Sequence, residues 1–173
     1  MMKCWIVVAS LILLTLPSGS SGEDTPLQTV AHVDLDRYVG KWYELARYPN
    51  RFERECDRNV TADYAKRASE IEVVNSCLTA DGKVKRSEGH AKIQDEASNA
   101  KLAVTFFWPF YGKYWVIDLG QNYEFAVVGE PSRKYLWILS RTSSLPDDKY
   151  ADIIGRLAAK GYDPSKLVKT KQQ

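Results

Sequence analysis

Between Trp42 and Arg141 the chain consists of short segments in which apolar and polar residues alternate. Alternation with a period of two is typical of half-buried strands, and no long segment in this region has the period of a helix. Turn residues such as Ala80-Asp81-Gly82 separate the segments. The pattern predicts eight strands, at residues 42–48, 60–65, 70–77, 83–94, 101–107, 114–119, 124–129 and 135–140.

After Arg141 the period of the apolar residues changes to that of a helix. Tyr150, Ile153 and Leu157 fall on one helical face together with Ile154 and Ala158. Pro146 near the start of this segment and Gly161 after its end are typical of helix boundaries. The chain is therefore predicted to be all-β: an eight-stranded antiparallel up-and-down β-barrel with one C-terminal α-helix packed on it.

The first 22 residues have the pattern of an export signal. Lys3 precedes an apolar run at residues 5–16, which is too short to span a bilayer, and small residues follow at 18–22. The alternative is an uncleaved amphiphilic anchor. We expect a signal peptide at 1–22, an N-terminal extension at 23–32 and a single folded domain at 33–173, so the protein is exported.

The charge of the chain argues against a nucleic-acid partner. It has 24 basic and 22 acidic residues in 173, a formal net charge of +2. Nucleic-acid binding proteins usually concentrate basic residues into a patch or stripe, and the sequence has no such cluster. No internal repeat or interdomain linker is visible either.

Two cysteines remain once the predicted leader is removed, because Cys4 lies within it. In an exported protein disulfides persist, and folding the second and third predicted strands into a hairpin at Lys66-Arg67 places Cys56 opposite Cys77 and Ala62 opposite Ile71. We therefore predict a disulfide between Cys56 and Cys77.

The alternative for these cysteines is a catalytic or metal-binding thiol. Only two histidines are present, His32 and His90, and neither stands at a metal-ligand spacing from a cysteine or a carboxylate cluster. No Ser, His and Asp set is suggested by spacing. We expect no metal, no cofactor and no catalytic residue.

Three segments of the chain resemble the three conserved motifs of the lipocalin family, in the same order. They are Gly40-Lys41-Trp42-Tyr43-Glu44, Tyr114-Trp115-Val116-Ile117-Asp118-Leu119 and Leu136-Trp137-Ile138-Leu139-Ser140-Arg141. The segments Phe52-Glu53-Arg54 and 106–112 are most similar to the group of bacterial outer-membrane lipocalins and apolipoprotein D-like proteins. The resemblance covers nearly all of the chain after the leader.

The resemblance implies that Gly40, Trp42 and Arg141 form the closed floor of the barrel, with the Arg141 guanidinium across the indole. Eight-stranded barrels of this kind, for which lipocalins are a standard example, hold one small ligand. The ligand implied is a lipid, a fatty acid or lysophospholipid, carried for maintenance of the cell-envelope membrane. The place implied is the periplasm or outer membrane, or the secreted space, although no cysteine stands at the end of the leader for a lipid anchor.

The open end of the barrel is expected to carry the residues that meet the ligand. Counting alternate residues from Trp42 places Glu44, Ala46 and Tyr48 on the cavity side of the first strand. An aromatic cluster at the connection between two strands is expected at the rim, because large apolar side chains gathered at a surface usually mark a binding site. Its members are Phe106, Trp108, Phe110 and Tyr111.

Trp108 is expected at the cavity entrance, where it contacts bound lipid or docks the protein on a membrane or on a second barrel as a homodimer. Two other functions stay open from the sequence. One is a lipocalin-like enzyme acting on a small lipophilic ligand, and the other is an envelope protein that uses the aromatic cluster to contact another protein.

Overall fold

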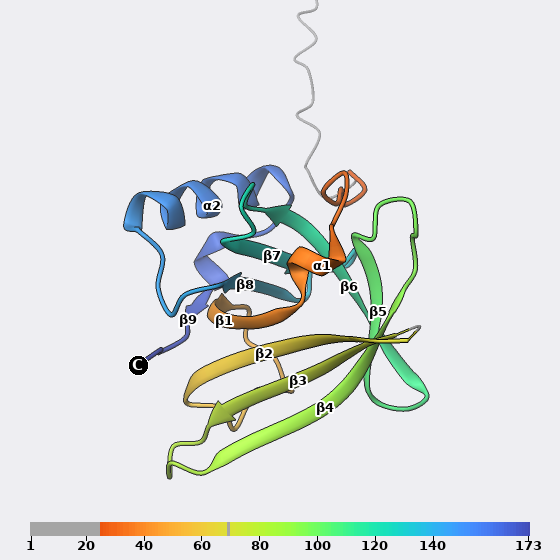
Figure 1. Ribbon diagram of the computed structural model, residues 1–173. Coiled ribbons are helices and arrows are strands. Elements are labelled where there is room, and N and C mark those ends of the chain that lie inside the picture. The colour runs from red at the N-terminus through yellow and green to blue at the C-terminus, as the bar shows by residue number, and fades with distance from the viewer. Residues whose placement is uncertain (1–24, 69) are drawn as a thin grey trace, which may run out of the picture.

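The computed structural model describes residues 25–68 and 70–173 of the chain. Eight strands form a closed antiparallel barrel, and a short ninth strand is added to β1 (Figure 1). The strands are β1 (Gly40–Arg47), β2 (Arg58–Arg67), β3 (Glu70–Leu78), β4 (Val84–Ile93), β5 (Lys101–Phe107), β6 (Phe110–Leu119), β7 (Phe125–Gly129), β8 (Leu136–Ser140) and β9 (Val168–Lys169). The helices are α1 (Leu35–Tyr38), α2 (Asp147–Ala159) and the 3-10 turn η1 (Pro164–Lys166).

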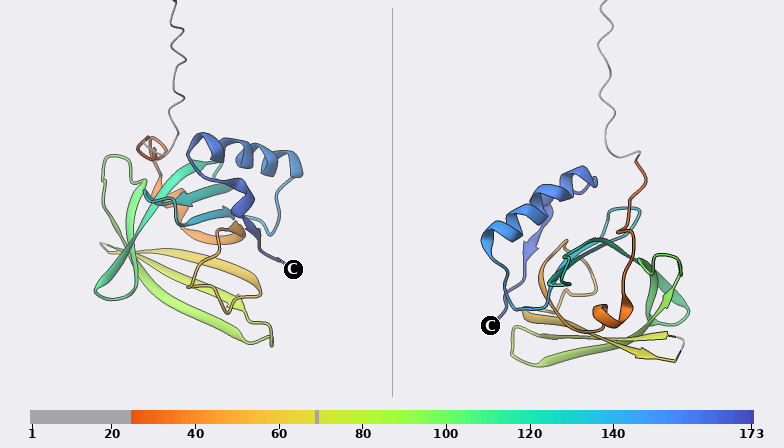
Figure 2. Two further views of the ribbon diagram at one scale, coloured as in Figure 1. Left: turned by 180° about the vertical axis from the view of Figure 1, so that it is seen from behind. Right: turned by 45° about the horizontal axis from the view of Figure 1, so that its top comes forward.

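The predicted fold class is confirmed. From β1 to β8 each strand pairs with the next along the chain, and β1 closes the barrel by pairing with both β2 and β8. α2 lies outside the barrel wall, whereas α1 lies across one end of the barrel (Figure 2). The elements missing from the sequence prediction, α1, η1 and β9, are too short for a periodic pattern to show.

Most strand boundaries lie within a few residues of the prediction, but β6 starts at Phe110 instead of residue 114. Phe110-Tyr111-Gly112-Lys113 does not alternate in polarity, so its sequence resembles a loop. It nevertheless pairs with the end of β5, with Gly112 opposite Val104 and Phe110 opposite Phe107. Only Trp108 and Pro109 connect the two strands, so the aromatic cluster lies on a tight hairpin.

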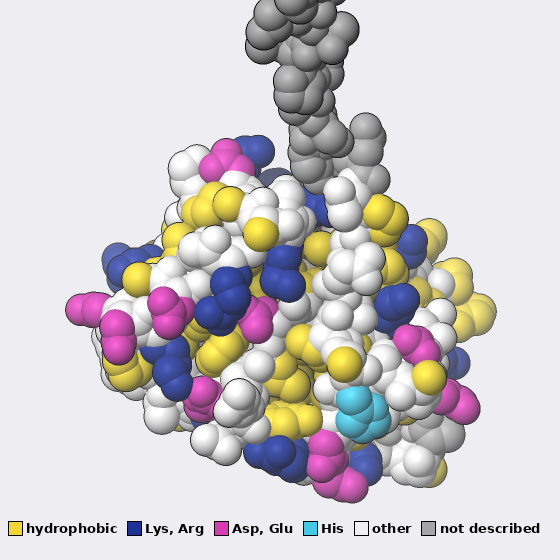
Figure 3. All heavy atoms as spheres, turned by 90° about the horizontal axis from the view of Figure 1, so that it is seen from above, with side chains coloured by type: hydrophobic (Ala, Val, Ile, Leu, Met, Phe, Trp, Pro, Cys, Tyr) yellow, Lys and Arg dark blue, Asp and Glu magenta, His cyan; other side chains and the backbone are white. Residues whose placement is uncertain are grey.

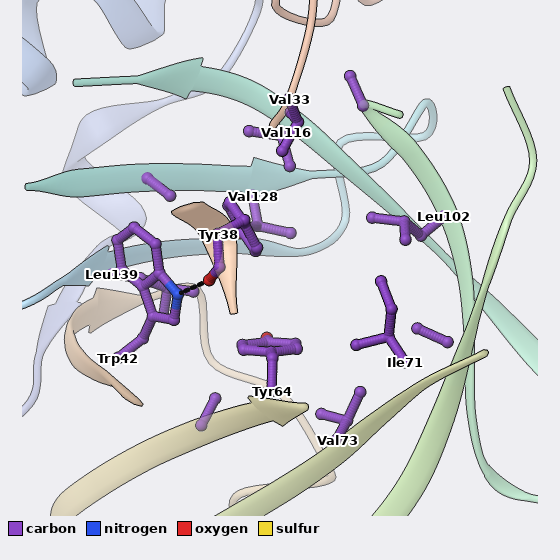
Figure 4. Close-up of a cluster of buried hydrophobic side chains, with 14 of the residues drawn as sticks. Val33, Tyr38, Trp42, Tyr64, Ile71, Val73, Leu102, Val116, Val128 and Leu139 are labelled. Atoms are coloured by element: carbon purple, nitrogen blue, oxygen red, sulfur yellow. Dashed lines mark hydrogen bonds between the residues drawn. The ribbon is translucent and has the colours of Figure 1, made fainter. Parts of the chain in front are cut away.

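Apolar side chains form two separate clusters, one inside the barrel and one outside it. The inner cluster gathers around Trp42, Tyr64, Val73 and Leu139, whose side chains point into the interior (Figure 4). The outer cluster lies between the wall and α2, where Ile153 and Leu157 of the helix pack on Leu45, Ala46, Ile117, Val127, Leu136 and Ile138. The outer cluster explains the apolar stripe of α2, because that stripe is the face of the helix that packs on the barrel wall.

The closed end is held by one tryptophan and one arginine from opposite ends of the barrel sequence. The Arg141 guanidinium lies 3.8 Å from the centre of the Trp42 ring and donates hydrogen bonds to the carbonyls of Arg37, Tyr38 and Lys41. The Trp42 indole donates to the Tyr38 carbonyl (2.8 Å, Figure 4). Gly40 has a φ of 94°, and a Cβ there would lie 3.5 Å from the Arg141 guanidinium. The last turn of α1 is thus fixed to β1.

Cys56 and Cys77 form the predicted disulfide, with 5.6 Å between their Cα atoms. The register behind that prediction is wrong, because Ala62 pairs with Asn75 and Ile71 pairs with Lys66. The turn follows Arg67 instead of lying at Lys66-Arg67, which shifts the pairing without exchanging the two faces of the strands. Cys56 reaches its partner from the loop before β2. This bond closes a loop between residues 21 positions apart. By the chain-entropy argument, closing such a loop stabilises the fold by about 3 kcal/mol.

The predicted signal peptide at 1–22 lies outside the described residues. Part of the predicted extension at 23–32 is packed on the barrel. Leu27 is buried in the outer cluster, and the Val30 amide donates to the Val116 carbonyl at 3.0 Å. These contacts make residues 25–32 part of the fold.

The closed end gives a stability prediction. Arg141→Ala removes three hydrogen bonds from a cation to backbone carbonyls and the contact with the indole, so we expect a loss of about 2 kcal/mol and a fall of about 5 °C in Tm. Arg54→Ala, which removes an exposed arginine of the β1–β2 loop, serves as the control and should unfold like the wild type. Thermal unfolding followed by circular dichroism measures both. An unchanged Tm for Arg141→Ala would show that α1 and Trp42 alone close the barrel.

Candidate functional site

A cavity of about 600 Å³ occupies the barrel interior. It opens at the end opposite α1, where residues of the β1–β2 loop and of the β5–β6 hairpin line it (Figure 2). Most of its wall surface is apolar, although polar and charged side chains also contribute to the lining. Deep lining residues include Ala62, Tyr64, Val73, Tyr114 and Leu139, while Arg51, Phe52, Lys85, Phe107, Phe110 and Lys113 lie toward the opening.

Three tyrosines meet at the floor. The Tyr114 hydroxyl lies 2.8 Å from that of Tyr38 and 3.0 Å from that of Tyr64. Tyr38 also packs on Trp42, with 5.1 Å between ring centres. Burial raises the pKa of Tyr64 to about 12 and raises the pKa of Tyr38 and of Tyr114 well above the usual value. All three hydroxyls therefore stay protonated at neutral pH.

A buried acidic side chain, Glu44, lies in the wall of the cavity and is only 3% exposed. It accepts hydrogen bonds from the Thr170 hydroxyl and from Arg47. Arg47 also forms an ion pair with Glu53, at 3.0 Å between Nε and Oε2, and the Trp137 indole donates to Glu53 at 2.8 Å. Burial, and next the negative charge of Glu53, raise the pKa of Glu44 well above its usual value.

This polar network connects β1 to three other segments near the barrel opening. Glu53 belongs to the β1–β2 loop, Trp137 to β8 and Thr170 to the segment after β9. The Gln172 side chain adds hydrogen bonds to the carbonyls of Glu44 and Val60, at 2.7 and 2.8 Å. The network thus fixes one side of the cavity opening, so this part of the rim is preorganised.

The β5–β6 hairpin presents large aromatic side chains to solvent. Phe107 is 76% exposed, Trp108 78% and Phe110 72%, and the rings of Phe107 and Phe110 stack with 6.4 Å between their centres. The Lys92 ammonium lies 5.6 Å from the Tyr111 ring. Five of the eight large apolar side chains that are exposed in the described residues belong to this hairpin, and an exposed apolar cluster usually marks an interaction site.

The structure places four of the seven predicted rim residues in the cavity lining: Glu44, Phe106, Phe110 and Tyr111. Ala46 and Tyr48 lie instead in the outer cluster beneath α2, and Tyr48 donates its hydroxyl to the Asp163 carbonyl. The prediction for these two was wrong because the register of β1 shifts between Glu44 and Ala46, and the bulge inverts the alternation of side chains. Trp108 lies at the hairpin tip beyond the lining.

Sequence reasoning missed the floor tyrosines and the partners of Glu44. Tyr64 shares a face with Ala62 in the predicted hairpin, so its inward direction could have been predicted. Tyr114 stands in the segment that resembles the second lipocalin motif, where no site residue was predicted. Glu53 and Thr170 come from irregular segments, in which no periodic pattern shows where a side chain points.

Within residues 25–68 and 70–173, no three His, Cys, Asp or Glu side chains gather closely enough to hold a metal ion. No helix in the same ranges is long and apolar enough to cross a membrane. On the face seen in Figure 3, basic and acidic side chains are interspersed, so that face carries no continuous basic patch.

A family model described as a lipocalin-like domain matches residues 33–172 of the chain. The outer membrane lipoprotein Blc of Citrobacter freundii is 38% identical over 175 residues, covering 99% of this chain and 98% of that protein. Temperature-induced lipocalin-1 of Arabidopsis thaliana is 36% identical, covering 87% of this chain and 85% of its own. Apolipoprotein D of Bos taurus is 34% identical, covering 80% of this chain and 77% of that protein.

Solved structures of low sequence identity share the fold. Insecticyanin from the tobacco hornworm Manduca sexta superposes with a TM-score of 0.69 at 22% identity, covering 85% of each chain. Lobster apocrustacyanin A1 gives a TM-score of 0.65 at 17% identity, covering 80% of this chain and 79% of that one. At these identities the likeness concerns the barrel and its helix alone.

The buried Glu44 gives a prediction of pH dependence. The pKa of Glu44 is higher in the folded protein than the ordinary 4.5, so protonation of Glu44 favours the folded state. That stabilisation is complete below about pH 4.5 and is lost as the pH rises toward the raised pKa. The side chain introduced by Glu44→Gln does not ionise, so this variant does not lose stability in that pH range. Its stability relative to the wild type should therefore increase from pH 4.5 to neutral pH. Urea unfolding at stepped pH measures the difference.

The control is Glu55→Gln. A hydrogen bond from Lys85 lowers the pKa of the exposed Glu55, so its contribution to stability is lost only as the pH falls below about 4.5. Between pH 4.5 and neutral pH the stability of this variant relative to the wild type should therefore stay nearly constant. A flat or falling difference for Glu44→Gln would contradict the unfavourable burial of its charge.

Proposed function

The chain belongs to the lipocalin family, and from that premise we propose that it binds a single fatty acid or lysophospholipid in its barrel cavity and carries it within the cell envelope. The observation that carries the proposal is the cavity itself, about 600 Å³ in volume, mostly apolar and open at one end. Family membership supports a small lipophilic ligand, and the cavity supports one with a long apolar part.

The energy of burying one acyl chain is sufficient for useful affinity. A 16-carbon chain gains roughly 12 kcal/mol at most, at about 0.8 kcal/mol per methylene, while immobilising the ligand costs several kcal/mol. Micromolar binding needs about 8 kcal/mol. A carrier of modest selectivity therefore needs little recognition of the polar head.

The charges at the opening favour one orientation of the ligand. Three basic side chains, Arg51, Lys85 and Lys113, lie among the lining residues near the mouth. The acidic groups beside them are already paired, Glu55 with Lys85 and Glu53 with Arg47. A carboxylate or phosphate head placed there would meet basic side chains and water, while the acyl chain fills the apolar interior. The reverse orientation would bury the anionic head without a cation at the tyrosine floor, which is unfavourable.

We propose a carrier instead of an enzyme because Cys56 and Cys77, which line the cavity, are bonded to each other. Neither sulfur is then available as a nucleophile. The disulfide also supports export, since such bonds persist in oxidising compartments. The names of the Blc relatives place those proteins at the outer membrane, and we extend an envelope location to this chain.

Filling the cavity with a larger side chain should weaken lipid binding. Val104→Trp adds a large side chain at a lining position, and we expect the affinity for a fluorescent fatty acid and a fluorescent lysophospholipid to fall at least about tenfold. Val84→Trp is the matched control, because Val84 is 73% exposed and lies outside the lining. Titration of delipidated protein measures both. Equal affinities in the two variants would place the ligand outside the barrel and contradict the proposal.

We further propose that the β5–β6 hairpin docks on a membrane surface during lipid transfer. The exposed rings of Phe107, Trp108 and Phe110 suit the apolar boundary of a bilayer, and Lys92 and Lys113 suit anionic head groups. The hairpin borders the cavity opening, since Phe107 and Phe110 also line it. A docked barrel would therefore have its mouth toward the lipid source.

Trp108→Ala tests the docking. Because Trp108 is exposed, thermal stability should stay nearly unaltered, while vesicle association or lysophospholipid binding falls several-fold. Flotation with vesicles containing anionic lipid measures association, and vesicles without anionic lipid show the part due to charge. Sedimentation of the wild type and of Trp108→Ala shows whether the hairpin instead joins two barrels. Unchanged binding, association and oligomeric state would mean that the hairpin has only a packing role.

A further inference from the structure

The three floor tyrosines place polar groups at the depth where an acyl chain would end. Tyr64 and Tyr114 line the cavity, whereas Tyr38 does not. Tyr38 and Tyr64 are buried, and Tyr114 keeps part of its surface open to the cavity. Phenylalanine at these positions would fill similar space with no polar atom. The three hydroxyl groups are therefore not required for packing alone.

The hydrogen bonds among the tyrosines leave one hydrogen without an acceptor. Three hydroxyls supply three O–H donors, but only two links join them, Tyr38 with Tyr114 and Tyr64 with Tyr114. Each link uses one hydrogen, whichever group donates. No other protein atom accepts from these hydroxyls within the described residues. One O–H donor at the floor therefore stays free in every arrangement.

A buried donor without an acceptor is unfavourable, and a ligand that supplies the acceptor relieves that penalty. Before a lipid binds, water in the cavity can accept this hydrogen, because Tyr64 and Tyr114 line the space of about 600 Å³. A chain that reaches the floor displaces that water, so the chain itself must then supply the acceptor. The space beside the tyrosines measures about 10 Å³, at the lower limit for one water, and its other lining residues are apolar: Leu35, Ile71, Ala91, Leu102 and Val104. A water held there would have the tyrosine hydroxyls as its only polar partners.

The acceptor should be uncharged. All three hydroxyls stay protonated, and burial of an anion at the floor would require a nearby cation. The guanidinium nearest to Tyr38, that of Arg141, lies over Trp42 and donates to the carbonyls of Arg37, Tyr38 and Lys41. A hydroxyl, carbonyl or ether oxygen meets the requirement, and a carboxylate does not.

We infer that Tyr64 and Tyr114 form a hydrogen-bond donor site that selects lipids with a neutral oxygen at the buried end of the chain, such as ω-hydroxy or ω-oxo acyl chains. The inference rests on the proposed function, because it assumes that the chain enters the cavity tail first. It adds a polar requirement at the floor to the preference for an anionic head at the mouth.

Matched pairs of acids test the inference by calorimetric titration of delipidated protein. The pairs are hexadecanoate with 16-hydroxyhexadecanoate and dodecanoate with 12-hydroxydodecanoate, so that two chain lengths probe the depth. In the wild type, the hydroxylated member of at least one pair should bind about threefold or more tightly. In Tyr64→Phe/Tyr114→Phe that preference should shift by about tenfold toward the plain acid, whose own affinity is kept or increased.

Tyr38→Phe is the matched control. It removes a hydroxyl of the same trio that does not line the cavity, and the remaining Tyr64 and Tyr114 pair still has one spare hydrogen. Its preference should equal that of the wild type. Binding of the plain acid shows that each variant is folded. The same preference in the wild type and the double variant, or its loss in Tyr38→Phe, would overturn the inference, whereas failure of the wild type to bind any of the acids would overturn the proposed function.

Discussion

The barrel depends on a single strand, β1, that pairs with two neighbours in two different registers. Its first half pairs with β2, from Gly40 to Tyr43, and its second half pairs with β8, from Tyr43 to Arg47. The bulge between Glu44 and Ala46 lets the strand bend from one neighbour to the other. The bend leaves the far side of Ala46 and Arg47 open, and β9 pairs there. Closure, the helix-side cluster and the polar network at the mouth all follow from this bend.

The same bulge explains where sequence reasoning worked and where it failed. Alternation predicts the inward direction of Trp42 and Glu44, because the strand is regular up to that point. It fails for Ala46 and Tyr48, because one extra residue exchanges the two faces and nothing in the sequence Glu44-Leu45-Ala46 announces it. The disulfide was predicted from the correct faces but the wrong register, since turn geometry fixes register and the turn was placed too early.

The site itself was only partly accessible from the sequence. The aromatic cluster at the β5–β6 hairpin is visible as a run of large residues, because the residues that form it are contiguous. The Glu44 network joins β1, a loop, β8 and the segment after β9, and the tyrosine floor joins α1, β2 and β6. Such groups form only when distant elements meet, so a pattern along the chain can indicate the individual strands but not the contacts among their side chains.

The closing contacts of the barrel join residues that are about a hundred positions apart, Lys41 with Arg141 and Tyr43 with Ser140. When the amino terminus emerges first, β1 can pair with β2, but the edge of β1 that meets β8 stays unpaired until β8 has followed. During that interval Trp42 has no arginine to cover it, and exposed edges with apolar side chains favour aggregation. The order in which the chain emerges thus creates a vulnerable period, and its length is set by the time needed to deliver the intervening strands.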